Sequence, residues 1–243
     1  MASPRVRQIL LEVLTDPPGR ASTAAQVMQR LVAATLAAVK VDGASVALMT
    51  PAGHAGLLAA TDGPSAELEN LQLTLGEGPC LDASRAGRPV LQPDLSSGGT
   101  SRWPGFTSSA TNAGIAAVFA FPLQVGAIRL GVLDLYRTIT GSLEPLQLAE
   151  ALDFAAAATT ILLDLQHSAP IGELHPLLAV AADGHREIHQ ATGMISVQAA
   201  IGLTEALLLL RARAYAAERP LLEVANDVLN RRLTFYPEDD HDE

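Results

Sequence analysis

The pattern of hydrophobic and polar positions changes character along the chain. From Ser22 to Val39, apolar residues recur at spacings of one, three and four, which predicts an amphipathic helix. Shorter apolar runs follow, bounded by turn-forming residues, and these are typical of β-strands. The predicted strands cover residues 44–49, 56–60, 89–91, 115–123 and 130–136, and further helices cover residues 67–73, 145–165 and a short segment ending at Ala86. This order predicts an α+β fold, an α/β sandwich in which helices cover the faces of a mainly antiparallel sheet.

The last fifty residues follow a purely helical pattern. Three apolar stripes between His185 and Phe235 predict three short helices that can bury one another in a small bundle. Gly202 separates the first helix from the second, and Thr204 is expected to be the N-cap of the second. Pro220 is expected at the first position of the third helix, where its missing N–H costs nothing.

Turn-forming residues separate the two parts of the chain. Pro170, Gly172, Pro176 and Gly184 lie close together in the sequence, and such a cluster is typical of a domain boundary. We therefore predict a first domain at residues 20–166, a linker at 167–184 that holds one or two helical turns, a helical domain at 185–235 and an acidic tail at 236–243.

Composition places the chain among globular proteins. Of its 243 residues, 49% are hydrophobic and 17% are charged, which is ample for a buried core. Its single cysteine excludes an internal disulfide and a cysteine-rich zinc site. The absence of disulfides is typical of proteins in a reducing compartment. The N-terminus lacks the pattern of a signal peptide, and the most apolar run, residues 115–123, is about half as long as a membrane span. We expect a soluble cytoplasmic protein without a membrane partner.

The net charge of −10 is unevenly distributed. Residues 1–184 carry −6 and the tail at 236–243 carries −5, whereas the predicted helical domain carries +1 because it holds six arginines. A local excess of arginine in an acidic protein favours contact with a polyanion. The excess is small, however, so phosphate affinity should be limited, and the acidic tail could compete for the same surface.

Several motifs resemble known families. The segments VDGASVALMT, GEGPCLDA, IAAVFAFPL and LGVLDLYR, within residues 22–165, resemble a GAF domain, a small-molecule sensory fold. The segments HQATGM, LTEALLLLRARA and RPLLEVANDVL, within residues 185–235, resemble an ANTAR domain, the RNA-binding module of transcription antiterminators. Together they resemble an actinobacterial type of regulator, in which a GAF sensor controls the binding of stem-loops in a nascent transcript by an ANTAR module.

The resemblance to ANTAR domains implies a set of RNA-binding residues. The family commonly has a lysine before the glycine of HQATGM, and this chain has Thr192 there, which can donate a hydrogen bond but releases no counterion. The alternative is that the arginines form a solvated helix face. The implied RNA-binding residues are Gln190, Thr192, Gln198, Arg211, Arg213, Arg231 and Arg232.

Candidate residues of the first domain are fewer. Cys80 could be a redox-sensing or ligand-attaching thiol, although a small buried hydrophobe is the more ordinary interpretation. Trp103 and Phe106 lie in a stretch rich in Ser, Gly and Thr and could cover a ligand pocket as a lid, although ordinary packing is the more frequent interpretation of such residues. The sequence predicts no metal site, and it leaves the ligand and any cofactor unidentified. None of the common catalytic motifs is present, so we expect a protein that is not an enzyme.

Two functions remain open. The first is a signal-responsive transcription antiterminator that binds RNA stem-loops. The second is a ligand-gated regulator whose C-terminal helices dock a protein partner. A DNA-binding helix-turn-helix is disfavoured because RRLTFYPEDDHDE follows where a recognition helix should stand. We also expect a homodimer, because the helix at 145–165 carries a possible seam made of Leu146, Ala149, Leu152, Ala156 and Leu163.

Overall fold

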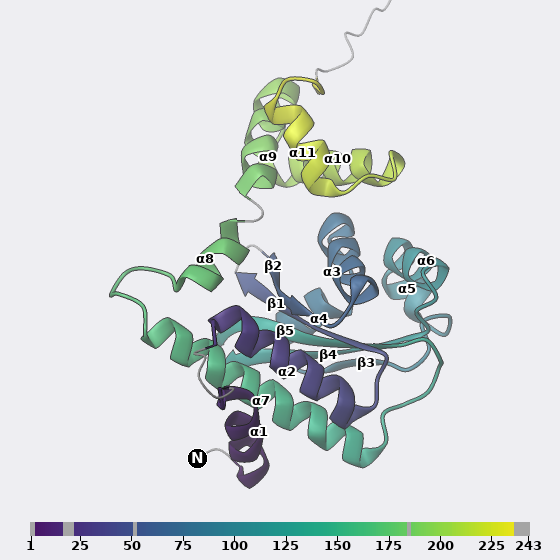
Figure 1. Cartoon of the computed structure of the whole chain (residues 1–243). Helices are drawn as coiled ribbons and strands as arrows, with labels where there is room; N and C mark the ends of the chain where they lie inside the picture. Colours follow the sequence, from purple (N-terminus) through teal and green to yellow (C-terminus); the bar gives the residue numbers. More distant parts are fainter. Residues whose placement is uncertain (1–2, 17–21, 51–52, 184–185, 236–243) are drawn as a thin grey trace, which may run out of the picture.

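An antiparallel sheet forms the centre of the protein (Figure 1). The computed structural model describes residues 3–16, 22–50, 53–183 and 186–235, so the predicted acidic tail lies outside the described residues. The sheet has five strands in the order β2-β1-β5-β4-β3, and every pairing is antiparallel. The strands are β1 (Gly43–Thr50), β2 (Gly53–Ala60), β3 (Val90–Gln92), β4 (Ala117–Val125) and β5 (Ile128–Arg137). The predicted α+β class and the mainly antiparallel sheet are confirmed.

Three helices cover one face of the sheet. Helix α2 (Ala24–Val39) packs on β1 and β2, α7 (Pro145–His167) packs on β4 and β5, and α1 (Pro4–Leu14) packs on both helices. Thr23 and Gln26 form a capping box, which starts α2. Alternate residues of the strands point to this face, and they build the larger hydrophobic core with the helices.

Four further helices cover the opposite face. They are α3 (Gly63–Leu75), α4 (Pro79–Ala86), α5 (Gly99–Arg102) and α6 (Pro104–Asn112). The strand residues that point here include Val118, Ala120 and Val132, which belong to a second core. Helices α5 and α6 lie in the stretch where we expected a lid, and they pack against each other at the edge of α3.

Helix α7 is long and apolar. It has 23 residues, and the mean hydropathy of its most apolar 18-residue window is 1.4, so it is the one unbroken helix of the described residues that could cross a membrane by length and composition. Core helices of soluble proteins meet the same criterion, and α7 buries Ala151, Phe154, Ala158 and Ile161 against the rest of the fold. Its packing in the larger core therefore accounts for its apolar character.

The C-terminal part forms a separate core. Helices α9 (Arg186–Ala199), α10 (Leu203–Ala216) and α11 (Leu221–Leu229) pack into a three-helix unit, which we call the bundle. The N-cap of α10 is Gly202, whose N–H donates to Glu205 Oε2 at 3.2 Å. The prediction of Thr204 as N-cap is therefore wrong, because α10 begins two residues earlier, at Leu203.

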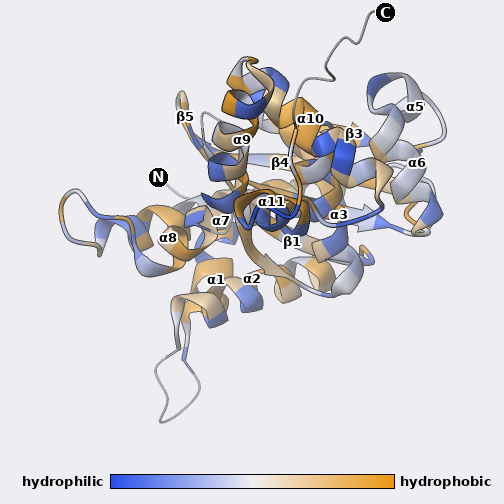
Figure 2. Ribbon diagram, turned by 90° about the horizontal axis from the view of Figure 1, so that it is seen from above, coloured by the Kyte–Doolittle hydropathy of each residue, from blue (hydrophilic) through white to orange (hydrophobic). Residues whose placement is uncertain are grey.

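The predicted linker contains a helix that belongs to the first core. Helix α8 (Pro176–Asp183) packs on β2, and it buries Leu178 and Ala181 there. A side chain at Gly56 would collide with the carbonyl group of Ala181, so only glycine permits this close approach. Figure 2 shows the bundle from above, with apolar residues along α10.

Candidate nucleic-acid interface

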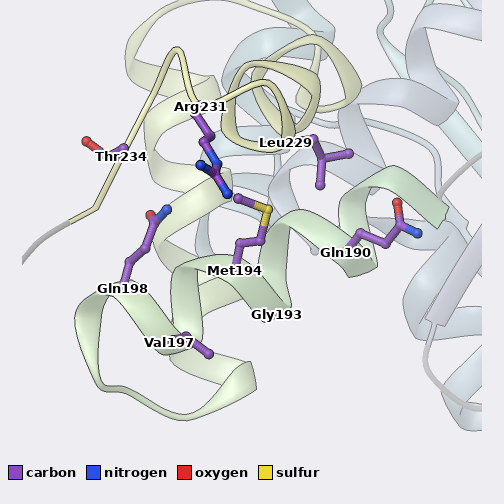
Figure 3. A pocket seen from close by; sticks show the side chains of 8 residues that line it. All are labelled: Gln190, Gly193, Met194, Val197, Gln198, Leu229, Arg231 and Thr234. Atoms are coloured by element: carbon purple, nitrogen blue, oxygen red, sulfur yellow. The ribbon is translucent and has the colours of Figure 1, made fainter.

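A groove of ≈ 940 Å³ runs along the bundle between α9 and the segment that follows α11 (Figure 3). Its floor is apolar, and Val197 is 83% exposed there. Its rim is polar and includes one positive charge, that of Arg231. The lining residues are Gln190, Gly193, Met194, Val197, Gln198, Leu229, Arg231 and Thr234.

Local geometry brings these residues together. Gln190, Met194 and Gln198 are spaced four residues apart, so they lie on one face of α9. After α11, Arg231 adopts a left-handed backbone with φ 57, and its N–H donates to the carbonyl oxygen of Val228 at 3.0 Å. The chain therefore reverses direction, and the Arg231 side chain extends toward Met194 (Figure 3).

One hydrogen bond fastens the reversed segment to α9. The backbone N–H of Phe235 donates to Gln198 Oε1 at 3.0 Å. The carbonyl oxygen of this side chain is thus occupied, whereas its amide nitrogen forms no hydrogen bond with the described residues. Gln198 can therefore offer N–H donors to a ligand in the groove.

The arginines of the bundle differ in their availability. Arg213 and Arg231 are exposed and form no ion pair within the described part of the chain. Arg232 is also exposed, but its Nη1 lies 3.7 Å from Asp227 Oδ1. Arg219 pairs with the same aspartate, at 2.8 Å. Positive charge that is free to meet a phosphate is therefore concentrated at Arg213 and Arg231.

Two of the predicted RNA-binding residues are not accessible. Thr192 is 6% exposed, and its hydroxyl donates to the carbonyl oxygen of Ile188 at 2.7 Å. Arg211 is largely enclosed where α10 meets the end of α3, and its Nε is buried without a hydrogen-bond partner. Desolvation lowers the pKa of Arg211, and the charge of Arg85 adds to this effect. In this arrangement of the chain Thr192 is buried and Arg211 is partly covered, and the assignment of both residues to RNA contact stays a prediction.

Helix α3 connects the bundle to the first part of the chain. Leu73 of α3 is buried in the bundle core, and α3 ends at Gly76, which adopts a left-handed backbone with φ 68. A side chain at Gly76 would collide with the guanidinium of Arg211. Other residues of α3, including Glu69 and Gln72, are buried over the sheet. A displacement of α3 would therefore affect both cores.

Cys80 is enclosed beneath α3 and α4. Its side chain is fully buried, and burial raises the pKa of the thiol well above its ordinary value, with further contributions from Asp134 and Glu69. The thiol is therefore protonated at neutral pH and is shielded from oxidants in solution. This environment disfavours the redox-sensing interpretation and agrees with the interpretation as a buried side chain.

Trp103 and Phe106 are core residues. Both are buried in the second core, and their rings meet edge to face with centroids 6.2 Å apart. The indole N–H of Trp103 donates to Asp82 Oδ2 at 3.1 Å, and the backbone N–H of Phe106 donates to Glu77 Oε1 at 2.9 Å. Their burial leaves neither ring at the surface, which agrees with the interpretation as ordinary packing and disfavours a lid.

Sequence reasoning missed the apolar floor of the groove and the buried carboxyl groups of the first part. Met194, Val197 and Leu229 were indistinguishable from bundle core by periodicity alone. Asp134 did give a recognisable signal, since an aspartate stands between leucines in the middle of the apolar segment LGVLDLYR. Such a residue in a central strand has to be buried, and buried carboxyl groups require a partner.

Comparison with known proteins extends these observations. No family model matches the chain, and no curated protein matches it. Among solved structures, it is similar to the GAF domain of a phosphoenolpyruvate-protein phosphotransferase from Acinetobacter. The sequence identity is 13% and the TM-score is 0.51. The alignment covers 69% of this chain and 95% of that chain. The GAF domain of the corresponding protein from Coxiella burnetii gives 15% identity, 67% and 93% coverage, and a TM-score of 0.50.

A further similar structure is that of an enzyme, the free methionine-R-sulfoxide reductase from Neisseria meningitidis. Its identity is 14%, with 64% and 84% coverage and a TM-score of 0.47. The expected absence of enzymatic activity and the resemblance of the bundle to ANTAR domains both stay predictions. The order of strands and the helices on both faces, together with the two GAF structures, establish that the N-terminal part of this chain has the GAF fold.

Proposed function

We propose that this protein is a signal-responsive regulator whose GAF-fold part controls the binding of RNA stem-loops by the bundle, as in a transcription antiterminator. One observation carries the proposal. The groove brings Gln190, Gln198 and Arg231 together, although Arg231 is more than thirty positions away in sequence. All three were assigned to RNA contact from the resemblance to ANTAR domains.

The chemistry of the groove suits unpaired bases of an RNA loop. Proteins recognise such bases through hydrogen bonds to their edges and through contact with their faces. The amides of Gln190 and Gln198 can form the hydrogen bonds, and the apolar floor offers a surface for a base. Arg231 can stack on a base or meet a phosphate, and the exposed Arg213 adds charge elsewhere on the bundle.

The contact between α3 and the bundle supports control by the GAF-fold part. Arg211 is held there without a hydrogen bond to its Nε, which is a costly position for a charged group. Release of the bundle from α3 would expose Arg211 to solvent. Its guanidinium could then contact RNA phosphates together with the exposed arginines of the bundle. A signal that moves α3 would thus change RNA affinity, which gives two states coupled through a single helix.

The decisive experiment is crosslinking of the full-length protein to RNA in cells, followed by sequencing of the recovered transcripts. We expect enrichment of leaders with stem-loops, and loss of that enrichment in the double variant Gln190→Ala and Arg231→Ala. The matched control is Arg186→Ala, which removes an arginine of α9 that pairs with Asp183 outside the groove. Recovery of no RNA above background from the wild-type protein would contradict the proposal.

A second function is favoured by the apolar surface of the bundle. Leu203 and Leu208 of α10 are exposed, and so is Val197 in the groove. Such a surface suits a protein partner, and the bundle would then be a ligand-gated docking module. A salt titration separates the two functions, because affinity for phosphates falls steeply with salt whereas apolar docking changes little.

A further inference from the structure

Three chemically reactive side chains meet beneath α3, away from the groove. Glu69 comes from α3, Cys80 is the second residue of α4, and Asp134 lies in the middle of β5. Each offers one ligand atom, and these atoms all lie within 4.8 Å of one another. All three residues are buried, so the cluster is enclosed by the protein.

Asp134 is the least satisfied member of this cluster. It is 1% exposed, and neither carboxyl oxygen makes a well-formed hydrogen bond with the described residues, although Glu69 and Cys80 lie next to it. Its strand neighbours across β1 and β4 are Ser45 and Ala120, and neither satisfies these oxygens. Burial of a polar group without a hydrogen-bond partner costs roughly several kcal/mol. Buried carboxyl groups without partners are therefore rare, and each one calls for an explanation.

The other two residues are held in place by their surroundings. The hydroxyl of Ser45 donates to Glu69 Oε1 at 2.8 Å, which orients this carboxyl group. The backbone N–H of Cys80 donates to Gln72 Oε1 at 2.7 Å, and Gln72 lies one turn after Glu69 on α3. Hydrogen bonds of this kind orient the ligands of metal sites, and they tune the affinity for the ion.

We propose that Glu69, Cys80 and Asp134 bind a divalent transition-metal ion of the Zn²⁺ or Fe²⁺ class. Tetrahedral coordination by sulfur and oxygen places ligand atoms about 3.4–3.6 Å apart, given metal–ligand distances of about 2.0–2.3 Å. The present separations are within 4.8 Å, so they exceed this spacing by about 1.4 Å at most. Small rotations of the three side chains can therefore close the site around an ion.

The set of donors selects the kind of metal. A thiolate favours zinc and iron over magnesium and calcium, which prefer ligands that are all oxygen. Binding of the ion would release the proton of the Cys80 thiol to solvent. The resulting thiolate and two carboxylates carry three negative charges, and a divalent cation would compensate most of this charge. Three protein ligands also leave a coordination position open, as in sites where the metal itself receives a small molecule.

Metal binding would act on the helix that contacts the bundle. Glu69 lies on α3 one turn before Leu73, which is buried in the bundle core. An ion that draws Glu69 toward β5 would displace α3 and so disturb this contact. The effect on RNA rests on the proposed function, whereas metal binding itself is independent of it.

The test uses the full-length protein after removal of metals with a chelator, titrated with Co²⁺ and then with Zn²⁺. Because Cys80 is the chain's single cysteine, a sulfur-to-cobalt charge-transfer band can come only from this site in one protein molecule. We expect one Co²⁺ per chain with this band, and its displacement by Zn²⁺. Asp134→Asn and Glu69→Gln should each weaken Co²⁺ binding by at least about 100-fold.

The matched control is Glu67→Gln, which removes the same charge from the exposed side of α3 and should leave binding unchanged. X-ray absorption of the zinc-loaded wild-type protein gives a readout without any variant, and it should show one sulfur among oxygen ligands.

Absence of the charge-transfer band from the wild-type titration would overturn the proposal. So would an unchanged titration in folded Asp134→Asn and Glu69→Gln proteins. RNA binding enters none of these measurements, so failure here is distinct from failure of the proposed function.

Discussion

Asp42 connects the start of β1 to the segment that follows β5. Its Oδ2 accepts hydrogen bonds from both the backbone N–H and the hydroxyl of Thr138, each at 2.7 Å. These bonds stabilise the carboxylate and hold the pKa of Asp42 below its ordinary value, with the backbone N–H making the largest contribution. The exposed residue Asp42 thus links the start of β1 to the end of β5.

This arrangement predicts how stability depends on pH. Because folding lowers the pKa of Asp42, its contribution to stability is present above the unfolded pKa of about 3.9 and is lost as pH falls through the folded value. In urea unfolding at pH 7, Asp42→Asn should be less stable than the wild type, and the difference should shrink as pH falls below about 4. Asp164→Asn, an exposed position on α7, is the control. A difference that stays constant with pH would contradict the prediction.

At the scale of elements, α3 connects the bundle to the GAF-fold part. Its residues divide between two cores, since Leu71 packs in the core over the sheet and Leu73 packs in the bundle. The stability of the bundle against the GAF-fold part therefore depends on one turn of this helix. Gly76 ends that turn beside Arg211 with a left-handed backbone that favours glycine, and an added side chain would have to displace the Arg211 guanidinium.

We predict that Leu73→Ala loosens the bundle without unfolding the sheet. Loss of a buried leucine side chain costs about 2–5 kcal/mol in a well-packed core, and less at a contact as small as this one. Hydrogen–deuterium exchange should increase in α10 and change little in β4 and β5. Leu71→Ala serves as the matched control, because it shortens a leucine of the same helix that faces the other core. Equal exchange of α10 in the Leu73→Ala and wild-type proteins would show that α3 does not hold the bundle.

For the molecule as a whole, the exposed side of α7 is the main candidate for self-association. The five residues of the predicted seam are all exposed, and Leu146 is 81% exposed. A stripe of this kind on a helix whose other side is buried suits pairing with a second copy. Two copies would present two bundles, which matches the two stem-loops implied by the resemblance to antiterminators.

We predict that the protein is a dimer in light scattering coupled to gel filtration, and that the double variant Leu152→Glu and Leu163→Glu is a monomer. The introduced glutamates would repel each other across the interface between the two copies. Each copy should keep its fold, and circular dichroism would show this. Ile128→Glu is the control, because it introduces a charge at an exposed apolar position of β5. A wild-type protein that remains monomeric at high concentration would contradict the prediction.

Much of the GAF-fold part could be predicted from the sequence. The strands β4 and β5 are apolar runs bounded by turn residues, and α2 has a capping box before its first turn. Helices α5 and α6 could not be predicted, because their residues are mostly Ser, Thr and Gly and resemble a loop. Their helical form depends on the burial of Phe106 and Ala110 in the second core.

The candidate site was predictable only in part. Gln190, Gln198 and Arg231 were named from the sequence, and the structure places them in one groove. The burial of Thr192 and the partial burial of Arg211 could not be predicted, since helix periodicity alone did not show which side of each helix would be covered. The boundaries of the domains and the function of the bundle remain predictions.

The sequence by itself determined all five strands and most of the helices, and their order, because burial imposes a local period of two on strands and of about 3.6 on helices. Only the tertiary structure decided which side chains meet. Glu69 and Asp134 are far apart in the chain and share a cluster because α3 packs over β1, the strand that pairs with β5. Arg211 is enclosed because α10 rests on the end of α3. Such contacts depend on how distant elements pack, and no pattern of neighbouring residues encodes that packing.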